Sequence, residues 1–385
     1  MLRTRNAVVA LAAALSLATI TAAGTQLPAS AHSARKAAQR GTLVVLPQIA
    51  APGSSAQAAS SAKTALTATF RPAVKGRTIA IQRKQGSKWV TVARQKQGRT
   101  TTFDFAVSYS YRGKAAVYRA IATGAKKSAA VTKAYRTSVH GTPDFSEDFK
   151  GTSLNSTVWN TRDQGYIGTR GCSKADPRAV RVSGGTLRLS TLKDPDRTAQ
   201  KCNYKGKKYS YRITGHVGTV TPNLGAGQTP TKSYKYGYFA ARMKMHSARG
   251  QHAGFWLQTT KSAGAARTHG SEVDIVEYFG DKHPEGGVAS YIYPPGKKIG
   301  GMIPSVTQYG RDWSKRYHVF SLQWTPSVYI FRIDGKETLR ITKNVSQVPE
   351  FMILSNLVSD WELPLGSESK LPQTAQVDWV RHWKL

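Results

Sequence analysis

The chain has 385 residues, with 56 Lys and Arg against 21 Asp and Glu, so its formal net charge is +35. This length is enough for two domains that each bury a hydrophobic core. No zinc-ligand spacing, phosphate-binding loop or dinucleotide-binding motif is present, and the lack of Gly-x-Ser-x-Gly disfavours an acyl-transfer hydrolase.

The positive charge is distributed unevenly along the chain. Up to His140 there are 22 basic residues and a single acid, Asp104, whereas 34 basic and 20 acidic residues follow from Gly141 onward. The two parts are therefore expected to be built differently. A nucleic-acid binder is suggested by charge alone, but no recognition motif accompanies the charge.

Residues 1–31 have the pattern of a secretory signal peptide. Arg3 and Arg5 form the charged end, the apolar run extends from Val8 to Ile20, and Ala29-Ser30-Ala31 is an A-x-A cleavage site. The alternative is a membrane anchor, for which the apolar run is short. We expect a secreted, extracellular protein that starts with a flexible basic lead over residues 32–41 and is free of the membrane after cleavage.

Residues 42–139 contain short alternating runs that are separated by Gly and Ser. Such runs at this spacing predict a small β-sandwich without a catalytic site, and they cover residues 78–82, 89–93, 102–105 and 116–120. The stretch from Gln82 to Trp89 weakly resembles the immunoglobulin-like accessory modules of exported bacterial enzymes. Residues 140–143 are predicted to be the linker to the second domain.

The chain has two cysteines, Cys172 and Cys202. In an exported protein a disulfide between them is favoured over free thiols or a metal site. The disulfide is expected to hold a Lys-, Gly- and Tyr-rich segment that has little apolar periodicity of its own.

Residues 144–385 are strands and turns with almost no helical periodicity, which predicts a large two-sheet sandwich. Between Tyr236 and Met245, Tyr238, Ala240, Arg242 and Lys244 alternate with an apolar set that should face the core. That set is Phe239, Ala241, Met243 and Met245. Further on, Asp334-Gly335 between two apolar runs predicts a hairpin.

Three acids lie in the strand-like stretch from Gly270 to Gly280: Glu272, Asp274 and Glu277. In a regular strand, Glu277 would point away from the other two and into the core, where an unpaired carboxylate is costly. A β-bulge over residues 274–277 would return it to their face. Crowded carboxylates repel each other, which suits a glycosidase better than a purely structural strand. A solvated edge strand is the structural alternative.

The Glu272-x-Asp274-x-x-Glu277 spacing resembles the bulged catalytic signature of glycoside hydrolase family 16, the laminarinase, lichenase and agarase group. The resemblance covers residues 144–385 and includes, in order, DFSEDF (144–149), GTLRL (185–189), YGYFAARMK (236–244), GFWL (254–257), FSLQWTP (320–326) and VDWVR (377–381). It implies an all-β chain in which a concanavalin-like jelly-roll β-sandwich follows a small immunoglobulin-like one.

The resemblance also implies roles for the acids. Glu272 would be the nucleophile, Glu277 the acid/base, and Asp274 the partner that tunes the nucleophile. Substrate contacts would come from Arg242 on a strand that faces the cleft and from Trp256, Tyr291 and Tyr293. For Trp256 and Tyr291 a plain core position is the alternative.

Family members often carry a structural calcium, and the resemblance offers Asp378, Glu147 and the Gly185 carbonyl as its ligands. An ordinary strand-end aspartate is the alternative for Asp378. No cofactor is expected for the chemistry itself. The sequence also departs from relatives: Gly270 replaces a frequent Trp, and either Ser355 or Asn356 takes the place of a frequent Asn.

The sequence therefore predicts a secreted, monomeric, retaining endo-β-glycanase whose polysaccharide substrate is β-1,3-glucan. The enzymatic alternatives are hydrolysis of an anionic galactan and transglycosylation, and the non-enzymatic alternative is a polysaccharide- or wall-binding protein. The basic N-terminal module is expected to bind an anionic cell-wall polymer, and no nucleic acid is expected as a partner.

Overall fold

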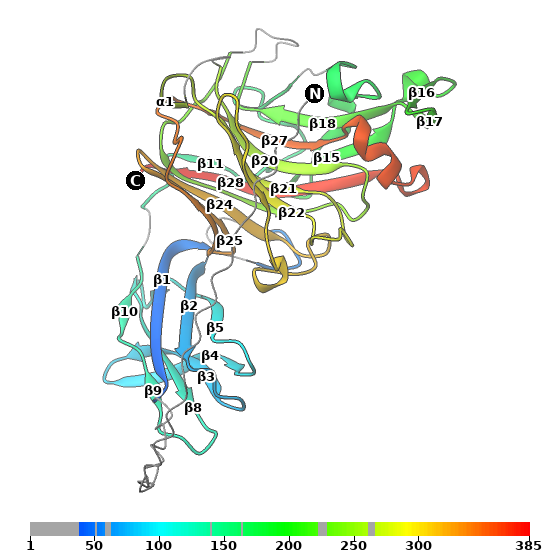
Figure 1. Ribbon diagram of the computed structural model, residues 1–385. Helices are drawn as coiled ribbons and strands as arrows, with labels where there is room; N and C mark the ends of the chain where they lie inside the picture. The colour runs from blue at the N-terminus through cyan, green and yellow to red at the C-terminus, as the bar shows by residue number, and fades with distance from the viewer. Residues whose placement is uncertain are drawn as a thin grey trace, which may run out of the picture. The chain divides into compact units, whose positions relative to one another are not determined.

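The computed structural model describes residues 38–50, 52–57, 63–138, 141–162, 165–221, 229–260 and 266–385 (Figure 1). The expected signal peptide, most of the basic lead and His140 of the expected linker lie outside these residues. Within these ranges no helix has the length and apolar character needed to cross a membrane.

The N-terminal part consists of two small antiparallel sheets, with strand orders β1-β2-β5 and β10-β8-β3-β4, in which β9 pairs with β8. Apolar side chains from both sheets, such as Leu66 and Phe105 from one and Ile81 and Tyr118 from the other, share one core. The predicted strands are therefore present. Their bounds, with the β6–β7 hairpin, are β1 Arg40–Ala50, β2 Lys63–Arg71, β3 Thr78–Gln85, β4 Lys88–Lys96, β5 Thr102–Val107, β6 Ser110–Tyr111, β7 Lys114–Ala115, β8 Val117–Thr123, β9 Ala130–Val131 and β10 Tyr135–Arg136.

The second part is built almost entirely from strands. These are β11 Phe145–Glu147, β12 Asn160–Thr161, β13 Ser173–Ala175, β14 Val180–Ser183, β15 Thr186–Lys193, β16 Lys201–Tyr204, β17 Lys207–Ser210, β18 Arg212–Gly218, β19 Gly237–Lys244, β20 His252–Gln258, β21 Glu272–Tyr278, β22 Val288–Tyr293, β23 Ile299–Met302, β24 His318–Thr325, β25 Val328–Ile333, β26 Lys336–Ile341, β27 Phe351–Leu357 and β28 Gln373–Trp383.

Helical structure in the described residues is limited to short turns. They are α1 Ala266–His269 and the 3₁₀ turns η2 Gly168–Arg170, η3 Pro177–Ala179, η4 Pro195–Arg197, η5 Val306–Gln308, η6 Asp360–Leu365 and η7 Glu368–Lys370.

The long strands follow one hydrogen-bonded order, β23-β22-β21-β20-β27-β18-β15-β28-β19-β24-β25-β26. The two ends of this order pack face to face, since Phe255 and Val273 from one half share a core with Phe239, Met243 and Phe331 from the other. The fold is the jelly-roll sandwich that the sequence predicts.

Two local predictions are confirmed. On β19, Phe239, Ala241 and Met243 face the main core, and Met245 follows them. Asp334 and Gly335 connect β25 to β26 with φ values of 48° and 83°, as a tight hairpin turn requires.

The end of β1 and residues 52–57 pack on the outer face of the second part, within the single compact unit Gln39–Leu385. Ile49 is fully buried in a cluster with Tyr238, Val319 and Trp379, among others. Gly53 exchanges backbone hydrogen bonds with Tyr317. Residues 52–57 are thus a loop that covers part of a sheet.

Candidate active site

The three acids lie on β21, and the strand contains the predicted bulge. Asp274 pairs with Tyr291 of β22, and Glu277 pairs with Ala289. The paired positions are therefore three residues apart on β21 but only two residues apart on β22. On the other side, Val276 and Asp274 pair with adjacent residues of β20. One extra residue, Ile275, is accommodated between them.

A side chain of the neighbouring strand satisfies the backbone of the bulge. The Ser290 hydroxyl on β22 donates to the Ile275 carbonyl at 2.9 Å, and both residues are buried. Ser290 therefore supports the geometry that brings the acids together.

Glu272, Asp274 and Glu277 line one cleft of about 160 Å³, together with Arg170, His252, Gly254, Trp256, Gln258, Ser355 and Leu357. Asp274 is only 4% exposed, while the Glu277 side chain keeps 20% of its surface open. The bulge thus places all three carboxylates on one face, with the middle one deepest.

Burial raises the pKa of each acid, and repulsion from a neighbouring carboxylate adds to it. For Glu272 the largest cause of the raised pKa is burial, and the second is the negative charge of Glu277. The pKa of Asp274 is raised well above its usual range by burial and by both glutamates. Burial also raises the pKa of Glu277, while the nearby His252 acts in the opposite direction. Such a cluster can hold a carboxylic acid in its protonated form near neutral pH, as a general acid requires.

Three cations surround the acids, and sequence reasoning did not identify them as site residues. Arg162 and Arg170 lower the pKa of Glu272 against the effect of burial, and Lys298 does so for Asp274 and Glu277. Arg162 also donates to the Gln258 side chain at 2.8 Å. No local pattern distinguishes these three from the other basic residues of the chain.

The predicted aromatic residues lie beside the acids. Trp256 pairs with Asp274 across β20 and β21, lines the cleft and is 8% exposed. On β22, Tyr291 pairs with Asp274 and Tyr293 with Glu272. Lys298 lies 4.1 Å from the centre of the Tyr291 ring. Trp256 thus lines the cleft, and the two tyrosines lie opposite Asp274 and Glu272 on the next strand. Substrate contact by the three rings stays a prediction.

The open question about Ser355 and Asn356 has a geometric answer. Ser355 lines the cleft and accepts a hydrogen bond from Nε1 of Trp256 at 3.0 Å. Asn356 is buried and donates to the carbonyls of Leu189 and Gln373. Of these two residues, Ser355 is therefore the one that lines the cleft.

The prediction that Arg242 faces the cleft is wrong. Arg242 lies on β19 in the other half of the sandwich, is fully buried, and pairs with Asp378 and the Ser55 carbonyl. An alternating pattern separates the two faces of a strand but does not say which sheet carries the cleft. The polar face of β19 is the one that residues 52–57 cover.

Two of the three expected calcium ligands already have other partners. The Asp378 carboxylate accepts from Arg242 and from the backbone N–H of Gln57. The Glu147 carboxylate accepts from the backbone N–H of Phe149 at 2.7 Å. In the part of the chain that the structure describes, no three acids, histidines or cysteines are grouped as metal ligands. The Arg242 guanidinium balances the charge of Asp378, and calcium binding stays a prediction.

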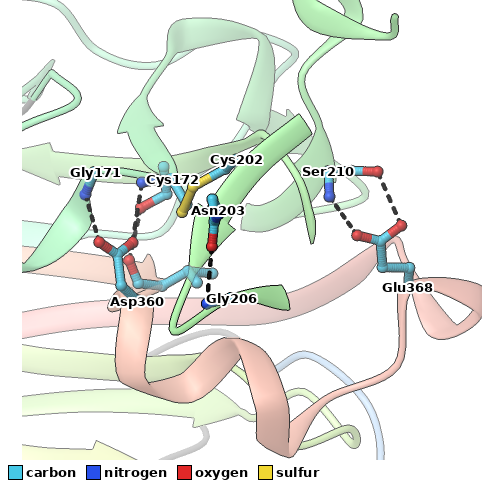
Figure 2. The surroundings of a disulfide bond; sticks show 10 residues. Gly171, Cys172, Cys202, Asn203, Gly206, Ser210, Asp360 and Glu368 are labelled. Carbon is cyan, nitrogen blue, oxygen red and sulfur yellow. Dashed lines mark hydrogen bonds between the residues drawn. A yellow bond between two sulfur atoms is a disulfide. The ribbon is translucent and has the colours of Figure 1, made fainter. Parts of the chain in front are cut away.

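The predicted disulfide between Cys172 and Cys202 is present, with the two Cα atoms 5.5 Å apart (Figure 2). Asp360 of η6 accepts from the backbone N–H groups of Gly171 and Cys172 at 2.8 and 2.9 Å. The disulfide connects the segment that carries Arg170 to β16, and Asp360 connects it to the turn η6.

A larger cavity of about 800 Å³ is lined by residues of β1, β2 and β5 and of the β25–β26 hairpin. Its acids are engaged: Asp104 pairs with Lys336 at 3.3 Å and Glu337 with Arg340 at 2.8 Å. This cavity has no set of free carboxylates comparable to the cleft of β21.

An all-β sandwich with three carboxylates on a bulged strand defines the glycoside hydrolase class of site. Residues 140–385, more than half of the chain, match the family model described as Beta-porphyranase A-D, GH16 domain, so the chain belongs to glycoside hydrolase family 16.

Curated relatives are distant. The chain is 24% identical over 274 residues to glucan endo-1,3-beta-glucosidase A1 of Niallia circulans, covering 62% of this chain and 37% of that enzyme. It is 24% identical over 269 residues to beta-porphyranase E of Zobellia galactanivorans, covering 63% of this chain and 86% of that enzyme. The match thus spans little more than a third of the Niallia enzyme.

Among solved structures, the catalytic domain of an endo-1,3-beta-glucanase (laminarinase) from Thermotoga petrophila RKU-1 is similar, with a TM-score of 0.50 and 18% identity. The match covers 63% of this chain and 97% of that domain. This similarity shows the fold.

Proposed function

We propose that the protein is a retaining endo-β-glycanase in which Glu272 is the nucleophile and Glu277 the acid/base. The bulge at Ile275 carries this proposal, because it places two glutamates from one strand in one cleft with Asp274 between them. Two carboxylates that converge from a single strand favour the close spacing of a retaining pair over the wider spacing that an inverting pair needs for a water molecule.

The reaction would have two steps. In the first step, a Glu272 oxygen bonds to the anomeric carbon while the glycosidic bond breaks and the leaving oxygen takes the Glu277 proton. In the second step, water loses a proton to Glu277, and its oxygen displaces Glu272. Asp274 lies between the two glutamates and tunes the nucleophile.

β-1,3-Glucan is the first candidate substrate. Two of the similar proteins, from Niallia circulans and Thermotoga petrophila, carry endo-1,3-β-glucan-cleaving names. Trp256, Tyr291 and Tyr293 lie beside the acids, and their rings would stack on sugar faces.

An anionic galactan is the second candidate, and one observation favours it. Arg162, Arg170 and Lys298 are close enough to the acids to influence their pKa values, so three cations border the cleft. A sulfate or carboxylate on the substrate could pair with such cations. The family model also takes its name from porphyranases.

One experiment tests the function and separates the substrates. The purified protein is incubated with laminarin, lichenan, agarose, carrageenan and porphyran, and products are separated by chromatography, with Glu272→Gln as the inactive control. Laminarin oligosaccharides support the first candidate, and products from a sulfated galactan support the second. Products longer than the donor would indicate transglycosylation, and no product from any glycan would favour a binding protein.

We infer export from the sequence of residues 1–31 and a monomer as the working form. The N-terminal module would hold the enzyme on an anionic wall polymer, because residues 38–138 carry many cations and Asp104 is their only acid.

A further inference from the structure

A histidine and a second carboxylate form a buried pair behind Glu277. Nδ1 of His252 lies 2.6 Å from Oε2 of Glu362, and Nε2 of the same ring lies 4.0 Å from Oε1 of Glu277. His252 is on β20, two residues before Gly254, which pairs with Glu277 on β21. The ring therefore approaches Glu277 diagonally across two neighbouring strands.

The short turn η6 fixes the position of Glu362. Its Oε2 also accepts from the backbone N–H of Ser359 at 2.8 Å, as part of a capping box, and the residue is 1% exposed. Because Glu362 accepts at Nδ1, that nitrogen carries a proton, and Nε2 is the position whose protonation can change. Nε2 is the nitrogen that faces Glu277.

Charges from several elements surround this ring. Burial acts against a charged His252, but Glu362 and Glu277 outweigh it and raise the pKa of the imidazole, while Arg170 of η2 opposes them. Around Glu277, the other charged groups are Glu362, Lys298 and Arg170, together with Glu272 and Asp274 of the same cleft. The two acids at the ends of the ring thus favour its cationic form.

We propose that His252, held by Glu362, is the positioning residue for Glu277: it orients the Glu277 carboxyl group and supplies a positive charge beside it after the proton has left. This inference rests on the proposed function. When Glu277 gives its proton to the leaving oxygen, the new carboxylate faces an imidazolium 4.0 Å away. When water returns a proton to Glu277, the charge disappears again, and His252 keeps its protons throughout.

His252→Gln tests this role. Glu277 then loses a neighbouring cation, so its pKa rises and the alkaline limb of kcat/KM moves up by about one pH unit or more. On the native polysaccharide kcat/KM should fall about tenfold or more, since general acid catalysis contributes about 10²–10⁴. An aryl glycoside with a good leaving group should lose much less.

His318→Gln is the matched control. His318 is buried like His252, and its Nδ1 lies 2.7 Å from the Asp334 carboxylate, but it is on β24 and outside the cleft. This variant should lose stability to a similar degree and keep both the wild-type pH profile and the wild-type dependence on the leaving group. If His252→Gln behaves like His318→Gln in both respects, the proposal is wrong.

A second measurement does not depend on activity. NMR titration of the histidine rings should show that Glu277→Gln lowers the pKa of His252, because the variant removes an adjacent negative charge and coupling between two sites is reciprocal. An unchanged His252 titration overturns the proposal. If the coupling is present but no glycan is cleaved, the proposed function fails and the His252–Glu277 pair stands.

Discussion

Glu272 and Glu277 have the same side chain in different surroundings. Burial raises the pKa of both. At Glu272 the charge of Glu277 adds to burial, and Arg170 and Arg162 oppose it. At Glu277 the strongest opposing charge is His252, and Glu362 acts in the same direction as burial. Each glutamate thus has both cations and another acid beside it, and substitution is what distinguishes their roles.

Substitution of each glutamate separates the two roles. Glu272→Ala should abolish turnover, and azide should restore it with inversion, because azide takes the place of the missing nucleophile. Glu277→Ala should still cleave substrates with good leaving groups, and azide should then give a retained product. Product stereochemistry from NMR decides between them. The opposite pattern would exchange the roles, and inversion by the native enzyme would exclude the retaining mechanism.

Asp274 should make stability depend on pH. Its pKa is raised in the folded chain, so ionisation favours the unfolded state: the free energy of unfolding is highest below the ordinary pKa of Asp and falls as pH rises toward the raised value. Asp274→Asn should therefore raise Tm by about 2–4 °C at pH 8, if the gain is about 1 kcal/mol, and change it little at pH 4. Thermal unfolding at several pH values measures this.

An exposed acid provides the control for this effect. Glu285→Gln neutralises a side chain on the surface, and it should leave the pH dependence of Tm as it is in the wild type. The same Asp274→Asn variant should lose activity if Asp274 tunes the nucleophile as proposed. Equal shifts in Tm at pH 4 and pH 8 would show that the gain does not come from ionisation.

At the level of elements, the bulge depends on a bond between neighbouring strands. Ser290→Ala removes the hydroxyl that donates to the Ile275 carbonyl and should cost about 1–3 kcal/mol, since a buried carbonyl loses its side-chain donor. It should also lower kcat, because the acids lose their relative placement. Chemical denaturation and steady-state kinetics measure the two effects.

Thr214→Val is the comparison for Ser290→Ala. The Thr214 hydroxyl on β18 donates to the Lys174 carbonyl at 3.0 Å and does not line the cleft. This variant should lose stability and keep kcat. If both variants change kcat equally, Ser290 has no special role in the bulge.

Much of the catalytic strand could be predicted because its chemistry conflicts with a regular strand. Glu277 among apolar residues requires either a buried charge or an extra residue, and the structure has the extra residue at Ile275. The alternating pattern of β19 likewise identified its core face. It could not show that the polar face, with Arg242, lies outside the cleft, because that depends on how the strands are ordered in the sheet.

Other parts of the site have no local signal. His252 and Glu362 are 110 residues apart in the chain, and they meet because β20 lies beside β27, which leads into η6. Arg170 is held near the cleft by a disulfide and by Asp360. Such contacts follow from topology, which a single sequence pattern does not contain.

At the level of the whole molecule, the N-terminal part contributes contacts to the outer face of the catalytic part. Ile49 belongs to a cluster with Trp379, and the backbone of Ser55 and Gln57 satisfies Arg242 and Asp378. A truncation that removes residues 32–140 would therefore uncover apolar surface and leave the ion pair without these backbone partners. Surface substitutions are a cleaner way to test what the module binds.

The last prediction concerns the charge of that module. Lys84, Lys88, Arg94 and Lys96 are exposed on β3 and β4. Changing all four to Gln should lower the salt concentration that elutes the protein from dextran sulfate and leave turnover of a soluble oligosaccharide unchanged, because exposed charges act over about 8 Å at physiological ionic strength. The control changes four exposed cations of the second part, Lys207, Lys208, Lys315 and Arg316, and should affect elution less. Equal effects of the two sets would show that binding depends on the net charge of the whole chain. Salt-insensitive binding to neutral dextran would show that the module is a sugar-specific domain.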